Sequence, residues 1–171
     1  GTQPYSEENS SRDSFWLAFL TFGEGYHNFH HTFQADYRNG HKWYHMDPSK
    51  WWIQSFKYLG LNTDLKSTPK HSIEIAKVNM RFKKRADRLQ QRNVNIHRFE
   101  DRLSKCKENL RAKMYEVQKA KREIRKMAKD SKIAMKNKIS ELKDSIKMAK
   151  NDLRQLFKEM NAEYKQAKTA A

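Results

Sequence analysis

Three histidines between residues 27 and 31 have the spacing of a metal-binding motif. His27, His30 and His31 form an H-x-x-H-H box, His-Asn-Phe-His-His. On a helix, residues three and four apart lie on the same face, so the box places up to three imidazoles within one turn. Neutral imidazole binds iron, zinc, copper and nickel, so the residue type does not name the metal. Surface histidines on a helix are the alternative, and three histidines cannot complete a two-metal site by themselves.

The residues next to the box indicate how it would be positioned. Gly23 and Gly25 flank Glu24 immediately before the box and permit a sharp turn or a close backbone approach at the start of a helix. Glu24 either accepts a hydrogen bond from a ligand imidazole or acts as a favourable charge at the helix N-terminus. Asn28 lies between the histidines and either orients one of them or faces solvent.

A longer string around the box resembles a known family. Residues 23–33 read Gly-Glu-Gly-Tyr-His-Asn-Phe-His-His-Thr-Phe and are followed by Asp36-Tyr37-Arg38. Together they resemble the third histidine box of membrane fatty acyl-CoA desaturases of the stearoyl-CoA delta-9 type. Residues 1–5, Gly-Thr-Gln-Pro-Tyr, look like the Gly-x-x-Pro-Tyr segment that precedes this box in the family. The resemblance runs from Gly1 to about Met80, and it looks like the bacterial type at Asn39-Gly40, Trp43-Tyr44, Asp47-Pro48 and Lys50-Trp51.

The resemblance implies a chemistry for these residues. His27, His30 and His31 would be iron ligands of a centre with two non-haem iron ions, and Glu24 and Asn28 would support those ligands. The implied reaction removes two hydrogens from a saturated fatty acyl-CoA or acyl-lipid, with O2 as co-substrate, and leaves a cis double bond, usually at delta-9. Electrons would come from an external donor of the ferredoxin or cytochrome type. A further family histidine just before the Gly-x-x-Pro-Tyr segment is absent here.

We expect this chain to be the carboxy-terminal part of a longer protein, because Gly1 is not an initiator methionine and the other histidine boxes are missing. The family implies an integral membrane protein, held by upstream helices, with the box and the tail on the cytoplasmic side. The longest apolar run, Phe15–Phe22, is far shorter than the roughly 20 residues of a transmembrane helix. The chain alone is expected to be inactive. A related di-iron hydroxylase and a non-enzymatic coiled-coil scaffold are the alternatives.

Short helices are expected around the box. Residues 1–12 are polar and predict a loop, after which Ser11 or Asp13 would cap a helix with an apolar face that packs on protein or lies at a membrane interface. Packing is the favoured interpretation. A second helix is predicted from Asp47-Pro48-Ser49 to Gly60, followed by a linker over 61–70. The aromatic cluster suits a membrane interface or a small core and consists of Trp43, Tyr44, Trp51 and Trp52.

Other residues near the box have weaker signals. Asp36 and Arg38 are predicted to form an ion pair. His41 and His45 are four apart, but Asn39-Gly40 beside them favours a turn, and neither matches a family ligand. The single cysteine, Cys106, excludes an internal disulfide.

Charge divides the chain at about residue 72. Residues 1–72 carry seven Lys/Arg and seven Asp/Glu, whereas residues 73–171 carry 29 Lys/Arg and 13 Asp/Glu. We therefore predict a desaturase-type segment over 1–72 and a basic tail over 73–171.

The tail has a heptad pattern and lacks Gly and Pro from residue 72 onward. Apolar residues recur in steps of three and four over 96–127 and again, one residue out of phase, over 139–160. The fold class is therefore all-α, with a long basic helix or coiled coil of about 140 Å if continuous, or a hairpin folding back near 129–132. The tail is expected to be a solvated helix that forms a homodimer; alternatively, its basic surface binds anionic lipid headgroups or steers an acidic electron donor or acyl carrier. Nucleic acid is not favoured, because there is no zinc motif or stacking platform.

Overall fold

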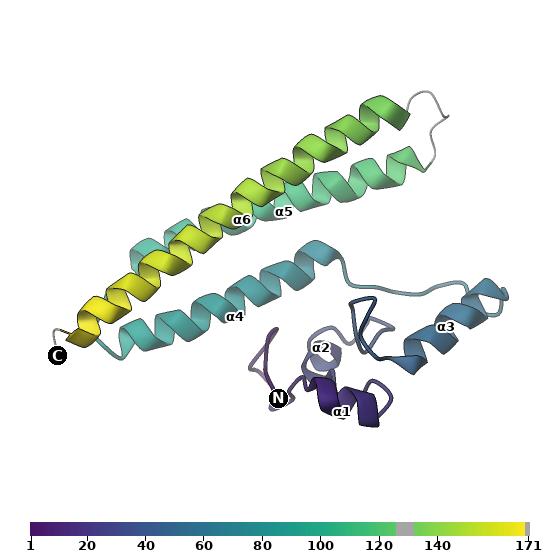
Figure 1. Ribbon diagram of the computed structural model, residues 1–171, viewed down its shortest axis with the longest axis horizontal. Helices are drawn as coiled ribbons and strands as arrows, with labels where there is room; N and C mark the ends of the chain where they lie inside the picture. The colour runs from purple at the N-terminus through teal and green to yellow at the C-terminus, as the bar shows by residue number, and fades with distance from the viewer. Residues whose placement is uncertain (126–131, 170–171) are drawn as a thin grey trace. The chain divides into compact units, whose positions relative to one another are not determined.

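All the elements that form over the described residues are helices, which confirms the all-α fold class (Figure 1). The computed structural model describes residues 1–125 and 132–169. The chain divides into two compact units, Gly1–Met80 (unit 1) and Arg81–Ala171 (unit 2). The assignment of residues 1–72 and 73–171 to functionally different domains stays a prediction.

Unit 1 contains three short helices: α1 (Phe15–Leu20), α2 (His27–Thr32) and α3 (Pro48–Tyr58). The loop over residues 1–12 is confirmed, and isolated bridges pair Thr2 with Asp13 and Asp13 with Tyr26. The cap of α1 is Ser14, whose hydroxyl accepts from the Leu17 amide, so the expectation of Ser11 or Asp13 is wrong. Asp13 instead uses its carboxylate on α2.

Helix α3 begins and ends as the sequence predicts. The Asp47 side chain accepts from the Lys50 amide, and Pro48 occupies the first turn, where its missing N–H costs nothing. Gly60 has a φ of 75°, the left-handed conformation that glycine adopts most readily after a helix.

Helix α4 (Lys70–Gln90) starts directly after Pro69. It ends where the sequence offers neither glycine nor proline, and the turn over residues 91–96 was not predicted. The φ of Asn93 is 57°, so asparagine supplies the left-handed residue. The signal available beforehand was the pair Asn93 and Asn95 in an otherwise helical sequence.

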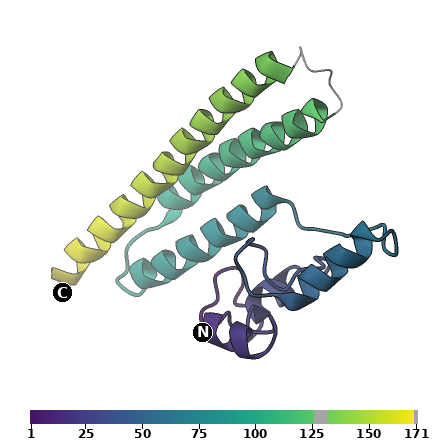
Figure 2. The same cartoon turned by 45° about the vertical axis from the view of Figure 1, so that its right-hand side comes forward.

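Helices α5 (His97–Ile124) and α6 (Lys132–Thr169) lie side by side in both views (Figures 1 and 2). Arg98 pairs with Glu163, and Arg102 pairs with Glu159, so the partner number falls as the first number rises and the helices are antiparallel. The hairpin alternative is therefore confirmed, and a single continuous helix is wrong. The turn expected near 129–132 falls mostly on residues outside the described ranges.

The heptad residues form the seam between α5 and α6. Phe99, Leu103, Leu110 and Ala120 are buried on α5. On α6 the buried residues are Ile139, Ala149, Leu153, Leu156, Phe157 and Met160. Alanine at positions 120 and 149 and the half-buried Cys106 make this seam thin along part of its length. Helix α4 adds three further buried apolar residues to the core of unit 2, namely Phe82, Ala86 and Leu89.

The apolar residues of α1 are not packed within unit 1, contrary to the favoured interpretation. Only Ala18 of this helix is buried, whereas Trp16 is 77% exposed. The aromatic cluster of residues 43–52 is also exposed, with Trp43 at 88%, so it does not form a small core. Over the described residues, no helix combines the length and the apolar composition that a membrane span requires.

Candidate metal centre

Helix α2, which carries the histidine box, is held by a side chain from outside the helix. Tyr26 at its start makes no side-chain cap. Instead, Asp13 Oδ1 accepts from the backbone amides of Asn28 (2.8 Å) and Phe29 (3.2 Å). These amides have no partner inside the helix, so the carboxylate satisfies their hydrogen bonds. Its negative charge also interacts favourably with the positive N-terminal end of the helix dipole. The helix expected at the box is confirmed.

Asn28 anchors the box to the loop over residues 5–11. Its Oδ1 accepts from the Tyr5 and Ser6 amides, and its Nδ2 donates to the Ser6 and Ser11 carbonyls. The side chain is fully buried, and these bonds use both of its donor hydrogens. All of the hydrogen bonds recorded for this side chain go to backbone atoms. Asn28 thus fixes the helix on which the histidines lie, and a role toward a bound metal stays a prediction.

The glycines before the box permit a close backbone approach. A Cβ on Gly25 would lie 2.0 Å from the Ala18 nitrogen, so no other residue fits there. Gly23 has a φ of 107° and lies against Asp47. The sharp entry to α2 therefore depends on both glycines.

Two of the three histidines have the spacing of ligands to one ion. The Nε2 atoms of His27 and His31 lie 3.0 Å apart, a hydrogen-bond distance between the two imidazoles. Two nitrogens bound at right angles to the same metal, each at about 2.1 Å, would be separated by about 3.0 Å. The His27 Nδ1 atom lies 3.3 Å from the Glu24 backbone oxygen, a contact that leaves Nε2 available to a metal.

His30 lies farther from this pair than its two members lie from each other, whose ring centres are 4.5 Å apart. Its ring centre lies 6.5 Å from that of His27 and 5.7 Å from that of His31. Its Nδ1 is buried, and within the described residues it has no hydrogen-bond partner. The buried Nδ1 atoms of His45 and His71 share this feature, so the ligand role of His30 stays a prediction. Within the described residues, no group of three or more His, Cys, Asp or Glu is placed to hold a metal ion.

The Glu24 carboxylate lies apart from the histidine rings. It is exposed, and its Oε1 accepts from Asn39 Nδ2 at 3.3 Å. The contact from this residue to a box histidine is made by its backbone carbonyl. Support of the ligands by the Glu24 side chain therefore stays a prediction.

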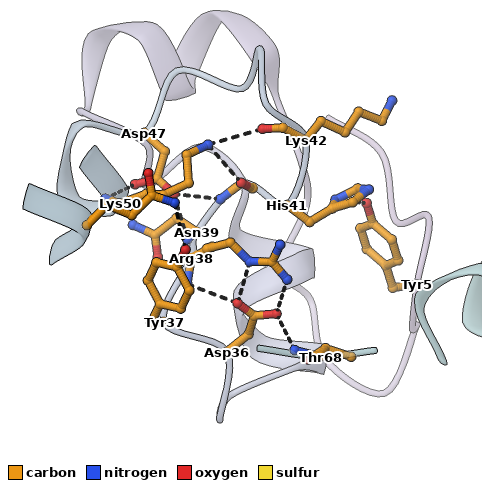
Figure 3. Close-up of polar contacts among 12 residues, drawn as sticks. Tyr5, Asp36, Tyr37, Arg38, Asn39, His41, Lys42, Asp47, Lys50 and Thr68 are labelled. Carbon is orange, nitrogen blue, oxygen red and sulfur yellow. Dashed lines mark hydrogen bonds and ion pairs between the residues drawn. The ribbon is translucent and has the colours of Figure 1, made fainter. Parts of the chain in front are cut away.

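Residues 39–47 form a loop beside the box, which we call the clasp loop, and the buried side chains of Asp47 and Lys50 close it (Figure 3). Asp47 Oδ2 accepts from the Asn39 and Gly40 amides at 2.8 and 2.9 Å. The Lys50 ammonium donates to three backbone carbonyls, those of Gly40, Lys42 and His45. Asp47 is fully buried and Lys50 is 5% exposed. Lysine is among the residues least often buried, so the sequence held no signal for this role.

The clasp loop holds two histidines against the box helix. The His45 ring stacks on Tyr26 with ring centres 4.2 Å apart, and the His41 ring stacks on Phe29 at 5.0 Å. Burial is the main cause that lowers the pKa of His41 to about 3 and that of His45 to about 4, with nearby lysines adding to the effect. Both imidazoles are therefore neutral at pH 7 and pack as aromatic rings. The turn expected here is confirmed.

The stability of unit 1 should fall as the pH drops from about 6.5 toward 4. Both histidines have a folded pKa below their usual value of about 6.5, so the unfolded chain binds more protons in this window. His45→Phe keeps a ring on Tyr26 and removes one titrating group. We expect it to reduce the pH dependence of the urea midpoint by about half. The measurement is urea unfolding followed by tryptophan fluorescence, because all four tryptophans lie in unit 1.

A matched control is His97→Phe, which removes an exposed histidine from unit 2. This variant should keep the pH dependence of the original chain. An unchanged slope in His45→Phe would show that His45 is protonated in the folded state.

The ion pair predicted between Asp36 and Arg38 is confirmed and has two parallel hydrogen bonds. Arg38 Nε donates to Asp36 Oδ1 at 2.8 Å, and Nη2 donates to Oδ2 at 2.7 Å. The Thr68 amide also donates to Asp36, which fastens the linker before α4 to the segment after the box. Burial alone would raise the pKa of Asp36, but these hydrogen bonds outweigh it and hold the pKa below its usual value.

Comparisons with known proteins support the desaturase resemblance. Over 84 residues, 49% of this chain, the sequence is 48% identical to acyl-CoA desaturase 1 of Saccharomyces cerevisiae. The chain is similar to acyl-CoA desaturases. A probable acyl-CoA desaturase of Schizosaccharomyces pombe is 45% identical over 74 residues, and the delta-9 desaturase-like 2 protein of Arabidopsis thaliana is 42% identical over 66 residues.

These desaturases are much longer than the part that is matched. The aligned segments cover 16%, 15% and 22% of the three relatives. No protein-family model and no solved structure matches the chain. The relatives are fungal and plant proteins, so the expected bacterial type of desaturase stays a prediction.

Proposed function

We propose that this chain is part of a fatty acyl desaturase and that it contributes histidine ligands to an iron centre. The observation that carries the proposal is the His27–His31 pair, with Nε2 atoms 3.0 Å apart, on a helix of a chain that is 48% identical over 84 residues to a protein named acyl-CoA desaturase 1. The proposed reaction introduces a cis double bond, at delta-9, into a saturated fatty acyl-CoA or acyl-lipid.

The imidazole side chains of the box are a ligand type that suits non-haem iron, and we propose a centre with two such ions. His27, His30 and His31 would hold the metal, with the remaining ligands supplied from outside this chain. When bound, the iron would activate O2, with electrons from an external ferredoxin-type or cytochrome-type donor. The chain's own part is to present three imidazole side chains from one short helix, which Asp13 and Asn28 hold in place.

The surroundings of the box also suit a membrane-bound enzyme. The exposed aromatic residues of unit 1, including Trp16 and Trp43, have the amphipathic rings that are favoured at a membrane–water interface. We propose that the parent protein is anchored by helices outside this chain and that the box lies on the cytoplasmic side.

The full-length parent protein, expressed in a host that lacks this activity, tests the proposal. We expect new monounsaturated fatty acids by gas chromatography, and we expect them to vanish in His30→Ala. The matched control is His97→Ala, an exposed histidine in unit 2, which should leave the product unchanged. Bound iron should fall in His30→Ala and stay constant in the control.

Hydroxylated rather than unsaturated products would contradict desaturation and support a di-iron hydroxylase. Unchanged products and iron content in His30→Ala would contradict the ligand assignment.

A further inference from the structure

The basic excess of the chain lies on unit 2. Residues 81–171 carry 28 Lys/Arg and 12 Asp/Glu, whereas residues 1–80 carry eight of each. An even spread of these charges would need no partner, because lysine-rich helices are well solvated. The charges of α5 and α6 are not spread evenly, and their arrangement follows from the packing of the hairpin.

One edge of the seam between α5 and α6 carries charges of both signs. The Arg102–Glu159 ion pair bridges the two helices along this edge. Residues seven apart return to the same side of a helix, so Glu116 and Glu123 on α5 and Asp152 on α6 lie along it as well. We call this the mixed edge.

Over residues 104–125 of α5 and its C-cap and residues 133–154 of α6, the opposite edge carries cations and no carboxylate, and we call this stretch the basic edge. On each helix, the basic edge is a row of residues spaced alternately three and four apart. The row lies next to the buried seam, on the side opposite the Arg102–Glu159 ion pair. On α5 the row is Ser104, Lys107, Arg111, Met114, Gln118, Lys121 and Arg125; on α6 it is Ile133, Lys136, Ser140, Lys143, Lys147, Lys150 and Arg154. These fourteen described positions hold nine Lys/Arg and no Asp/Glu.

Most of the basic edge is accessible. Arg111, Lys121 and Arg125 are exposed on α5, and the exposed cations on α6 are Lys136, Lys143, Lys147 and Arg154. Beyond Arg154 the edge is covered, because the Arg85 guanidinium of α4 lies 4.6 Å from the centre of the Phe157 ring.

We propose that the basic edge binds anionic lipid headgroups at a bilayer surface. The α6 row from Ile133 to Arg154 extends over about 30 Å of a straight helix, so a flat anionic surface can meet all of its cations together. Each Lys/Arg near such a surface strengthens binding about fivefold. Ile133, 67% exposed at the end of the row, adds an apolar side chain that can enter the interface.

A membrane suits this edge better than nucleic acid does. The fourteen positions include no aromatic side chain on which a base could stack. The proposal concerns unit 2 alone and does not depend on whether the parent protein is a desaturase.

The 171-residue chain can be tested by co-sedimentation with vesicles. We expect binding to vesicles of equal parts phosphatidylcholine and phosphatidylserine, no binding to phosphatidylcholine alone, and weaker binding as salt is raised. The test variant combines Lys136→Gln, Lys143→Gln, Lys147→Gln and Arg154→Gln. We expect it to bind the anionic vesicles about 600-fold more weakly, because four cations are lost at about fivefold each. Circular dichroism checks that its helix content is unchanged.

The matched control removes the same number of charges from other exposed positions of α5 and α6. It combines Lys105→Gln, Lys138→Gln, Lys158→Gln and Lys165→Gln, and its binding should weaken less than about fivefold. Equal weakening in the two variants would overturn the proposal, because net charge alone would then explain binding. Equal binding of the original chain to both vesicle types would also overturn it. Tighter binding to duplex DNA or RNA than to anionic vesicles would assign the edge to nucleic acid instead.

Discussion

Asn28→Asp is expected to lower the free energy of unfolding of unit 1 by about 4 kcal/mol. The change keeps the size of the side chain and the acceptor for the Tyr5 amide. It removes the two N–H donors that satisfy the Ser6 and Ser11 carbonyls, at 2.8 and 3.1 Å. It also places a second carboxylate beside Asp13, which accepts from the Asn28 amide. Urea unfolding followed by tryptophan fluorescence measures the loss.

Gln34→Glu makes the same chemical change on an exposed side chain of unit 1. Its free energy of unfolding should stay within about 0.5 kcal/mol of the original value. A small effect of Asn28→Asp would mean that water replaces the lost donors and that Asn28 is not the anchor of the box helix.

Lys50→Met is expected to destabilise unit 1 by about 3 kcal/mol. Methionine fills a similar volume, but it leaves the carbonyls of Gly40, Lys42 and His45 without their shared donor and Asp47 without the neighbouring cation. The clasp loop should then open, and His41 and His45 should leave Phe29 and Tyr26. In the full-length parent protein, the same change should reduce bound iron, although Lys50 is not a ligand.

The matched control is Lys57→Met, which removes an exposed lysine from the same helix and should have little effect. Hydrogen exchange separates the outcomes: amides of residues 39–47 should lose protection in Lys50→Met and keep it in the control. Full protection in Lys50→Met would show that Asp47 alone closes the loop.

Local sequence signals predicted most of the elements correctly. The Asp47-Pro48 start of α3 and its end at Gly60 were both predicted, because caps and breakers act within a few residues. The end of α4 was missed because Asn93 is a weaker breaker than glycine. The seam residues were predicted from the heptads, but a heptad pattern is equally compatible with a long coiled coil and with a hairpin.

By itself, the sequence determined the all-α fold class, the helix that carries the histidine box and the resemblance to acyl-CoA desaturases, since each depends on residue types at short spacing. The tertiary structure decided how that helix is held: by Asp13 from an earlier segment, by Asn28 through the loop over residues 5–11, and by Lys50 through the clasp loop. It also decided that α5 folds back on α6 and so gathers the basic residues on one edge. These contacts join residues distant in sequence, and their polar side chains are usually solvated, so only the folded chain shows which of them are buried.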